Sequence, residues 1–332
     1  MVSEHPFAQY VRIIAKGPNL SRALTEAEIC EAARMIMAGE VEPVQLGAFL
    51  CVLRVKTETS EEVAGFARGI RGSLASPSAA PPVDLDWPTY AGKSRQLPWY
   101  LLSVLLLAQS GVRVFMHGAD AHTPNRLYAR ETLEALGIAP ATSMTQAVEQ
   151  LRARHFAYMG LEHLSPRLQD IMDLRSLLGV RSPIHTVARH LNPFDAPHQV
   201  LSVTHPPYRP VHRDAAKLLG QKHMVVFKGE GGEAERRPVK PCDSLTLDEG
   251  VCGERTWPSL LPESSEPSDA DMDPRRLLAV WSGDSDDSYP VRSVTGTAAV
   301  ALFMLGRASS PEAAQSLAEE LWSNRNRGRI LA

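Results

Sequence analysis

The feature that most constrains the fold is a repeated alternation of strand-like and helical segments that starts near residue 89. Short runs rich in β-branched and aromatic residues are each followed by a segment with helical character. In chain order the alternating segments are residues 112–116, 126–136, 156–159, 168–178, 200–203, 215–219 and 224–227. Such alternation predicts an α/β domain with a mainly parallel central sheet. A ligand of such a sheet is expected at the C-terminal ends of its strands.

The first 75 residues follow a different pattern, which is purely helical. Thr25 and Glu28 have the spacing of a capping box, and Thr59 and Glu62 repeat it. The apolar residues that follow recur with a helical period. Residues 1–75 are therefore predicted to form a small helical domain.

Amino-acid composition predicts the remaining domain boundaries. Residues 76–88 contain four prolines and are expected to form a hinge. The α/β domain is then expected to span 89–332, and part of 160–190 is expected to complete the helical domain. Residues 259–288 are acidic and rich in loop-forming residues, so an exposed insertion is predicted there.

Charge, cysteine content and the length of the apolar runs limit which partners and metal sites are expected. The chain has 35 basic and 38 acidic side chains and a net charge of −3, so any attraction to a polyanion has to be local. Its four cysteines are widely spaced, which favours free thiols over a zinc site. No apolar run is long enough to span a bilayer, and we expect a soluble cytoplasmic protein without a membrane partner.

Three stretches carry a resemblance to a known family. They are LTEAEICEAARMIMAGEVEPVQLGAFLCVLRVKTETSEEVAGFARGIR, LGVRSPIHTVARHLNPF and TGTAAVALFMLGRASSPEAAQSLAEELW. The chain resembles the anthranilate phosphoribosyltransferases and the related class II pyrimidine nucleoside phosphorylases. The resemblance implies a helical domain, a large α/β domain and a homodimer formed through the helical domain.

The loop that binds diphosphate in that family differs here. The family uses a glycine-rich loop whose backbone amides approach the phosphates at a helix N-terminus. The matching stretch is YAGKSRQLPW, in which only Gly92 remains and Lys93 and Arg95 add side-chain charge. Pro98 in the helix start has no N–H to donate.

The metal site implied by the resemblance also departs from the family. An adjacent Asp-Glu pair holds magnesium there, whereas Glu233 is followed by Ala234 here. Glu230 and Glu235 are close in sequence but do not restore the pair. Phosphoribosyl transfer needs the metal and the diphosphate loop together. These departures therefore point to a degenerate metal site at Glu233 and Glu230, no catalytic residues and no cofactor.

A smaller group with the same fold shares these departures. The Tyr90 to Lys93 loop, the strand end VFMHG and the segment KGEGGE resemble the YbiB-type proteins. That resemblance implies sequence-independent binding of DNA or RNA through the phosphate backbone, in an electropositive groove between the domains.

Nine side chains are candidates for phosphate contact. They are Lys93, Arg95, His117, Arg189, Arg236, Arg237, Arg325, Arg327 and Arg329. Cations beside a helix N-terminus suit an anion, and arginines without intervening acids suit a phosphodiester chain. A solvated turn at 93–96 and a frayed C-terminus are the alternatives.

Two further arginines lie at or near the start of the stretch LGVRSPIHTVARHLNPF, which resembles the family's second-substrate segment. Arg175 and Arg181 either line the groove or hold carboxylates of the helical domain. The second interpretation is favoured for Arg181, and both stay open for Arg175. In HGADAH, the spacing of His117, Asp120 and His122 fits no ordinary pair of metal ligands, so no metal site is predicted.

Two other functions stay open. One is a pentosyltransferase, either a phosphoribosyltransferase or a nucleoside phosphorylase, with an altered diphosphate loop, and only this alternative would use magnesium. The other is a scaffold that meets a protein partner through the acidic insertion. Nucleic-acid binding requires that residues 263–287 lie away from the groove.

Overall fold

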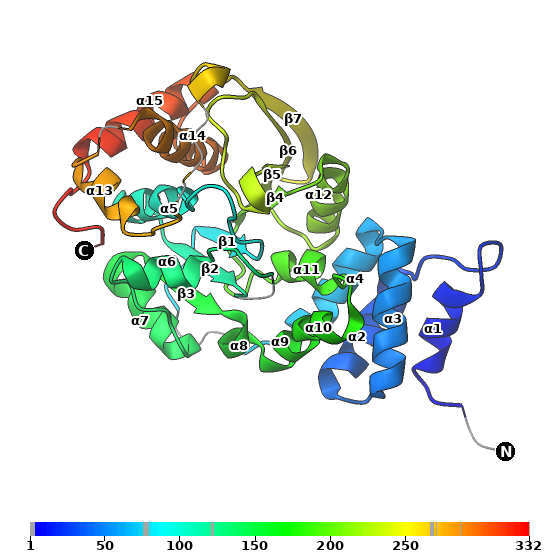
Figure 1. Cartoon of the computed structure of the whole chain (residues 1–332). Coiled ribbons are helices and arrows are strands. Elements are labelled where there is room, and N and C mark those ends of the chain that lie inside the picture. Colours follow the sequence, from blue (N-terminus) through cyan, green and yellow to red (C-terminus); the bar gives the residue numbers. More distant parts are fainter. Residues whose placement is uncertain are drawn as a thin grey trace.

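The structure is a computed structural model that describes residues 4–75, 80–120, 123–265, 269, 271–285 and 287–331. Figure 1 shows a smaller helical lobe beside a larger lobe built on a β-sheet. None of the helices in the described ranges combines the length and the apolarity that a bilayer crossing needs.

The helical lobe joins two separate parts of the chain. Its helices are α1 (Ala8–Ala15), α2 (Glu26–Ala38), α3 (Pro43–Lys56), α4 (Ser60–Arg71), α8 (Leu161–Leu164), α9 (Pro166–Asp173), α10 (Arg175–Leu178) and α11 (Ile184–Val187). Both predicted capping boxes are present, at the N-termini of α2 and α4. Buried apolar side chains from both parts form one core.

The described strands form one sheet in the order β3-β2-β1-β4-β5-β6-β7. Their bounds are β1 (Leu85–Thr89), β2 (Val114–Gly118), β3 (Phe156–Gly160), β4 (His198–Val203), β5 (His223–Lys228), β6 (Cys242–Asp248) and β7 (Val251–Trp257). Strands β1 to β5 pair in parallel, and β6 and β7 add an antiparallel hairpin. The mainly parallel α/β architecture is thus confirmed, whereas the hairpin was not predicted.

Helices cover both faces of this sheet. The apolar core on one face takes residues from α5 (Tyr100–Gln109), α6 (Ala129–Ala135), α14 (Ser288–Met304) and α15 (Pro311–Asn324). The other face packs on α7 (Met144–Arg154), α12 (Arg209–Leu218) and the helical lobe. In the described ranges, four short 3-10 helices lie in the connections: Ala188–His190, Pro206–Tyr208, Glu230–Gly232 and Glu263–Ser265.

Two predicted boundaries need correction. Residues 85–88 belong to β1 rather than to a hinge, because Leu85 and Trp87 are fully buried in the sheet core. The predicted hinge includes residues 76–79, which lie outside the described residues. The predicted acidic loop contains a helix, α13 (Arg276–Ser282), because Leu277, Val280 and Trp281 share one face that packs into the core.

Candidate functional site

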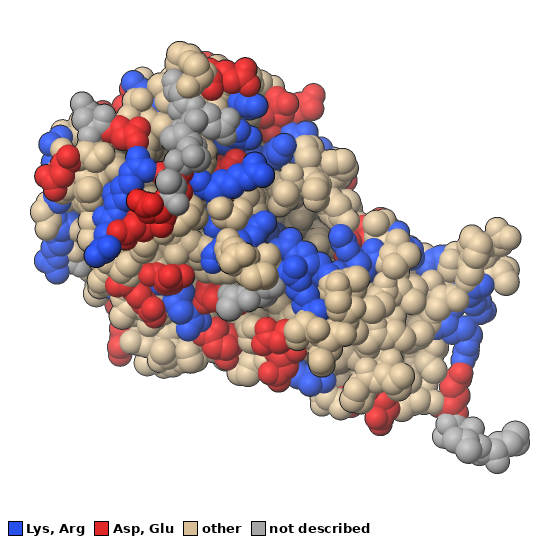
Figure 2. All heavy atoms as spheres, viewed as in Figure 1, with Lys and Arg blue, Asp and Glu red and all other residues tan. Residues whose placement is uncertain are grey.

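The candidate site is a cleft at the C-terminal edge of the sheet. The loops that follow β1, β4 and β5 meet there around a cavity of about 520 Å³. The strand order reverses between β1 and β4, the place where open α/β sheets bind ligands. Six cationic side chains line the cavity: Arg95, Arg126, Arg209, Lys228, Arg237 and Lys240. In Figure 2, Lys and Arg gather around the hollow between the two lobes. We call this cavity the basic cleft.

The loop after β1 is held tightly. Gly92 has φ of +68°, and a Cβ there would lie 2.9 Å from the ring of Tyr128. The Arg126 guanidinium donates to the carbonyls of Ala91 at 2.8 Å, Gly92 at 3.0 Å and Gly231 at 3.2 Å. Arg126 therefore ties the loop after β1 to the loop after β5.

Two carboxylates of the chain occupy the positions where this loop could bind an anion. Glu233 Oε1 accepts hydrogen bonds from the backbone N–H groups of Ala91 at 2.6 Å and Gly92 at 2.7 Å. Glu235 pairs with Lys93 Nζ at 2.6 Å and accepts from the N–H of Tyr100, the first residue of α5, at 2.8 Å. We call Glu233 and Glu235 the internal carboxylates. They satisfy the amide donors and the helix N-terminus that would otherwise attract a phosphate.

The internal carboxylates lie in a dry environment. Glu233 and Glu235 are both 0% exposed, and Lys93 is 1% exposed. Burial raises the pKa of Glu235, although the Lys93 charge opposes this effect. A buried pair of this kind holds the loop in one arrangement rather than leaving it ready to receive a ligand.

The residues present do not fit a magnesium site. Ala234 supplies no ligand, and one Glu233 oxygen already accepts two backbone hydrogen bonds. Its other oxygen is buried and has no hydrogen-bond partner among the described residues. The described residues contain no group of three or more His, Cys, Asp or Glu side chains suited to a metal. Magnesium prefers several oxygen ligands, and this donor set is too small.

Four candidate phosphate contacts are buried and cannot reach a nucleic acid in this arrangement. Lys93 is committed to Glu235. His117 is fully buried, where its Nδ1 hydrogen-bonds the Tyr90 hydroxyl at 2.8 Å and its Nε2 lies 3.3 Å from Asp86. Its place inside β2 explains the burial, because all five residues of that strand are buried.

The other two buried candidates bond to backbone carbonyls. Arg236 is 1% exposed and donates to the carbonyl of Pro258 at 2.5 Å. Arg325 donates to the carbonyls of Trp281 and Trp322 at 2.8 and 2.5 Å, and its guanidinium lies 3.7 Å from the Trp322 ring centroid. Both arginines therefore support the core.

Arg327 and Arg329 lie elsewhere in the molecule. They line a separate cavity of about 680 Å³ together with Arg154. Arg154 is the last residue of α7, which leads into β3, and Gln109, which accepts from the N–H of Asn326, is the last residue of α5, which leads into β2. The C-terminal arginines are thus at the N-terminal edge of the sheet, opposite the basic cleft.

Three of the candidates are at or near the cleft. Arg95 and Arg237 line it, and Arg237 Nε lies 3.4 Å from Glu230 Oε2. Arg189 is half-buried, and burial lowers its pKa despite the nearby Glu233. Sequence reasoning missed Arg126 and Lys228. Lys228 is the last residue of β5, and Arg126 lies in the connection that follows β2. These positions were the available signal, because the C-terminal ends of parallel strands share one edge of the sheet.

Arg189 belongs to a group of four arginines, Arg126, Arg175, Arg181 and Arg189, which we call the arginine cluster. Burial and the other three guanidinium groups lower the pKa of Arg181 to about 10. Arg175 donates to Thr123 Oγ1 at 2.6 Å. Within the described ranges no carboxylate lies within 4.0 Å of Arg181, so its expected carboxylate partner in the helical lobe is not found.

The acidic insertion reaches the edge of the cleft. Glu263 lies 3.2 Å from Lys240, which lines the cavity. Asp269 accepts from the N–H of Leu97 at 2.7 Å, and its own N–H donates to the Arg95 carbonyl. The condition that the insertion lies away from the groove is therefore not met, because Asp269 anchors it to the loop after β1 and Glu263 pairs with Lys240, and this counts against nucleic-acid binding.

Comparisons with known proteins show which families this chain is similar to. Residues 8–74 match the family described as glycosyl transferase family, helical bundle domain. An anthranilate phosphoribosyltransferase of Moorella thermoacetica is 29% identical over 330 residues, covering 94% of this chain and 92% of the relative. The uncharacterized protein YbiB of Escherichia coli is 28% identical over 245 residues, covering 73% of this chain and 76% of the relative.

Solved structures agree with the sequence relatives. Anthranilate phosphoribosyltransferase from Thermus thermophilus has a TM-score of 0.77 at 22% identity, covering 96% of this chain and 95% of that one. The enzyme from Saccharomyces cerevisiae in complex with PRPP and Mg has a TM-score of 0.78 at 17% identity, covering 99% of this chain and 96% of that one. The comparisons confirm the expected fold.

Proposed function

We propose that this chain, which has an anthranilate phosphoribosyltransferase-like fold and is a homologue of YbiB, binds the phosphate backbone of nucleic acid in the basic cleft and does not transfer phosphoribosyl groups. The observation that carries the proposal is the pair of internal carboxylates. Glu233 and Glu235 hydrogen-bond the backbone amides and Lys93 of the loop that corresponds to the family's diphosphate loop. Other cationic side chains line the cleft.

The proposed contacts are cationic side chains rather than backbone amides. They are Arg95, Arg126, Arg189, Arg209, Lys228, Arg237 and Lys240. Side-chain contacts to phosphate carry no sequence information, which supports binding without sequence preference. Glu230 and Glu263 pair with two of these cations, so we expect moderate or weak affinity.

Phosphoribosyl transfer is the second candidate. The relatives named above support it better than they support nucleic-acid binding, since they include an anthranilate phosphoribosyltransferase. In this case the cleft arginines would have to hold the diphosphate in place of the loop amides. The small donor set at Glu233 counts against the magnesium that this reaction uses.

A salt titration tests the main proposal. Anisotropy of a labelled random-sequence oligonucleotide should show binding whose affinity falls steeply with salt. The double variant Arg95→Gln, Arg237→Gln should bind more weakly and reduce the salt slope by about 1 to 2. The control Lys222→Gln, Arg307→Gln removes the same charge from exposed positions that do not line the cleft, and should behave like the wild type.

Two outcomes would contradict the proposal. One is the absence of binding at low salt, and the other is binding that is insensitive to salt. In parallel, PRPP with magnesium at millimolar concentration should not shift the melting temperature. A clear stabilisation would instead favour the transferase, because a ligand stabilises the state that it binds.

We also propose that the chain forms a homodimer through the helical lobe. The supporting observation is on α3, where Val44 and Val55 are 78% and 86% exposed. Light scattering should give the mass of a dimer, and Val44→Glu with Val55→Glu should give a folded monomer. A wild-type protein that stays monomeric at tens of micromolar would refute this assignment.

A further inference from the structure

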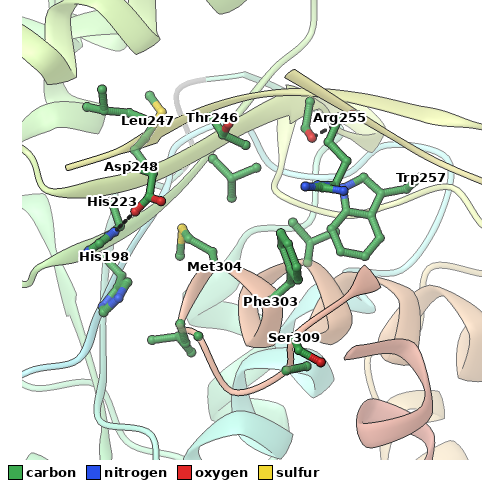
Figure 3. A pocket seen from close by; sticks show the side chains of 17 residues that line it. His198, His223, Thr246, Leu247, Asp248, Arg255, Trp257, Phe303, Met304 and Ser309 are labelled. Atoms are coloured by element: carbon green, nitrogen blue, oxygen red, sulfur yellow. Dashed lines mark hydrogen bonds and ion pairs between the residues drawn. The ribbon is translucent and has the colours of Figure 1, made fainter. Parts of the chain in front are cut away.

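A third cavity lies between the antiparallel edge of the sheet and α14, away from the basic cleft. Its volume is about 550 Å³. The wall on the helix side is apolar and includes Val300, Phe303 and Met304. Figure 3 shows Phe303 and Met304 extending from the helix toward the strands. We call this space the edge cavity.

The sheet wall of the edge cavity is unusually polar for a face covered by a helix. Directly paired residues share a face of a sheet. The register therefore places His198, His223 and Asp248 in one row of that face, and Ser244 with Arg255 in another. Elsewhere the same face carries core residues such as Phe227 and Val200. Ligand sites combine an apolar lining with a few such convergent polar groups.

Arg255 is the arginine that lines one end of the cavity. Its guanidinium carbon lies 4.6 Å from the ring centroid of Phe303, which holds the side chain flat. Trp257 meets Phe303 edge to face at 5.9 Å. No carboxylate lies within 4.0 Å of Arg255 in the part of the chain that the structure describes. Hydrogen bonds to its own backbone N–H and to Ser310 lower the pKa of Glu312, and the Arg255 charge adds a smaller effect at longer range.

The opposite end offers a hydrogen-bond acceptor. The rings of His198 and His223 stack at 4.6 Å, and His223 hydrogen-bonds Asp248 at 2.7 Å. His198 Nδ1 lies 3.0 Å from the Asp84 carbonyl, so this nitrogen carries the proton. The Nε2 atom of a neutral His198 ring then remains an acceptor.

From this arrangement we propose that the edge cavity binds a small flat aromatic carboxylate. The carboxylate would pair with Arg255, since a guanidinium matches its two oxygens. The ring would pack among Trp257, Phe303 and Met304, whose aromatic faces and thioether suit an aromatic group. The site is separate from the basic cleft and does not depend on its function.

The probe that tests this proposal is naphthalene-2-carboxylate, with naphthalene-2-carboxamide as a neutral ligand of the same shape. Calorimetry on the full chain should show saturable binding of the carboxylate, and binding of the carboxamide should be about ten-fold weaker or more. Arg255→Gln should weaken carboxylate binding by a similar factor. Thr246→Phe should abolish it by filling the cavity, and Arg307→Gln should leave it unchanged because Arg307 does not line the cavity.

A cleft variant distinguishes the two cavities. If the carboxylate binds in the edge cavity, the double variant Arg95→Gln, Arg237→Gln should bind it like the wild type. Loss of binding in that variant, with Arg255→Gln unaffected, would overturn the proposal. The absence of saturable binding up to about 10 mM would overturn it as well. A dissociation constant above that concentration would be too weak to indicate a specific site for a small ligand.

Discussion

At the scale of single residues, the internal carboxylates set the chemistry of the loop after β1. Glu233 bonds two backbone amides, and Glu235 bonds Lys93 and the first amide of α5. A carboxylate and a phosphate compete for the same donors because both are anionic oxygen acceptors. The donors of the loop thus bind anionic oxygens that the chain itself supplies.

Replacing Glu233 with alanine should free the amides of Ala91 and Gly92. We expect the variant to lose about 1.5 to 3 kcal/mol of stability, the usual contribution of hydrogen bonds to a charged group. Millimolar diphosphate should restore part of the lost melting temperature, and it should not stabilise the wild type. Equal shifts for both proteins would show that the internal carboxylate does not block the loop.

Removing Lys93 should be more damaging than its position in a loop indicates. Lys93→Ala leaves Glu235 buried without its cation, which typically costs about 3 to 5 kcal/mol. Chemical denaturation measures this loss. The double variant Lys93→Met, Glu235→Leu should be closer to wild type than Lys93→Ala. If Lys93→Ala loses less than about 1 kcal/mol, the buried pair does not hold the loop.

At the scale of elements, a buried histidine pair joins the 3-10 helix Ala188–His190 to α12. His190 Nε2 and His212 Nδ1 are 2.8 Å apart, and both residues are buried. Burial lowers the pKa of His190 well below its usual value and that of His212 to about 3. Arg189 adds to both shifts, and Arg71 adds to that of His190.

These shifts predict that acid destabilises the contact. Between the unfolded pKa of about 6.5 and the lower folded pKa, the unfolded chain binds more protons. Stability is therefore complete above about pH 6.5 and is lost as the pH falls toward 3. From pH 7 to pH 5, we expect a loss on the order of 1 to 2 kcal/mol per histidine. His212→Asn should flatten this dependence, and an unchanged pH profile would exclude the pair as its source.

At the scale of the whole molecule, the acidic insertion limits the charge of the basic cleft. Glu263 pairs with Lys240 at the rim. Glu263→Gln should strengthen oligonucleotide binding about two- to three-fold and increase the salt slope, because one more cation becomes available. Glu320→Gln, an exposed charge on α15, is the matched control. Equal affinities for both variants would mean that the insertion does not affect the cleft.

Local sequence patterns determined the helical first 75 residues, the strand and helix alternation and the mainly parallel sheet. Capping boxes and apolar periodicity act within a few residues, so these features can be read from the chain directly. The departure of the loop from its family pattern was also visible, since it depends only on which residues are present.

Only the tertiary structure decided which cationic side chains are buried and which line the cleft. Lys93 and Arg95 are two residues apart, yet one is buried against Glu235 and the other lines the cleft. Arg236 and Arg237 divide in the same way, since the first is buried and the second lines the cleft. Burial and pairing depend on partners that are distant in the sequence, since Glu235 lies 142 residues from Lys93 and the carbonyls bonded by Arg236 lie 22 and 60 residues away. A count of local charge contains no information about such partners.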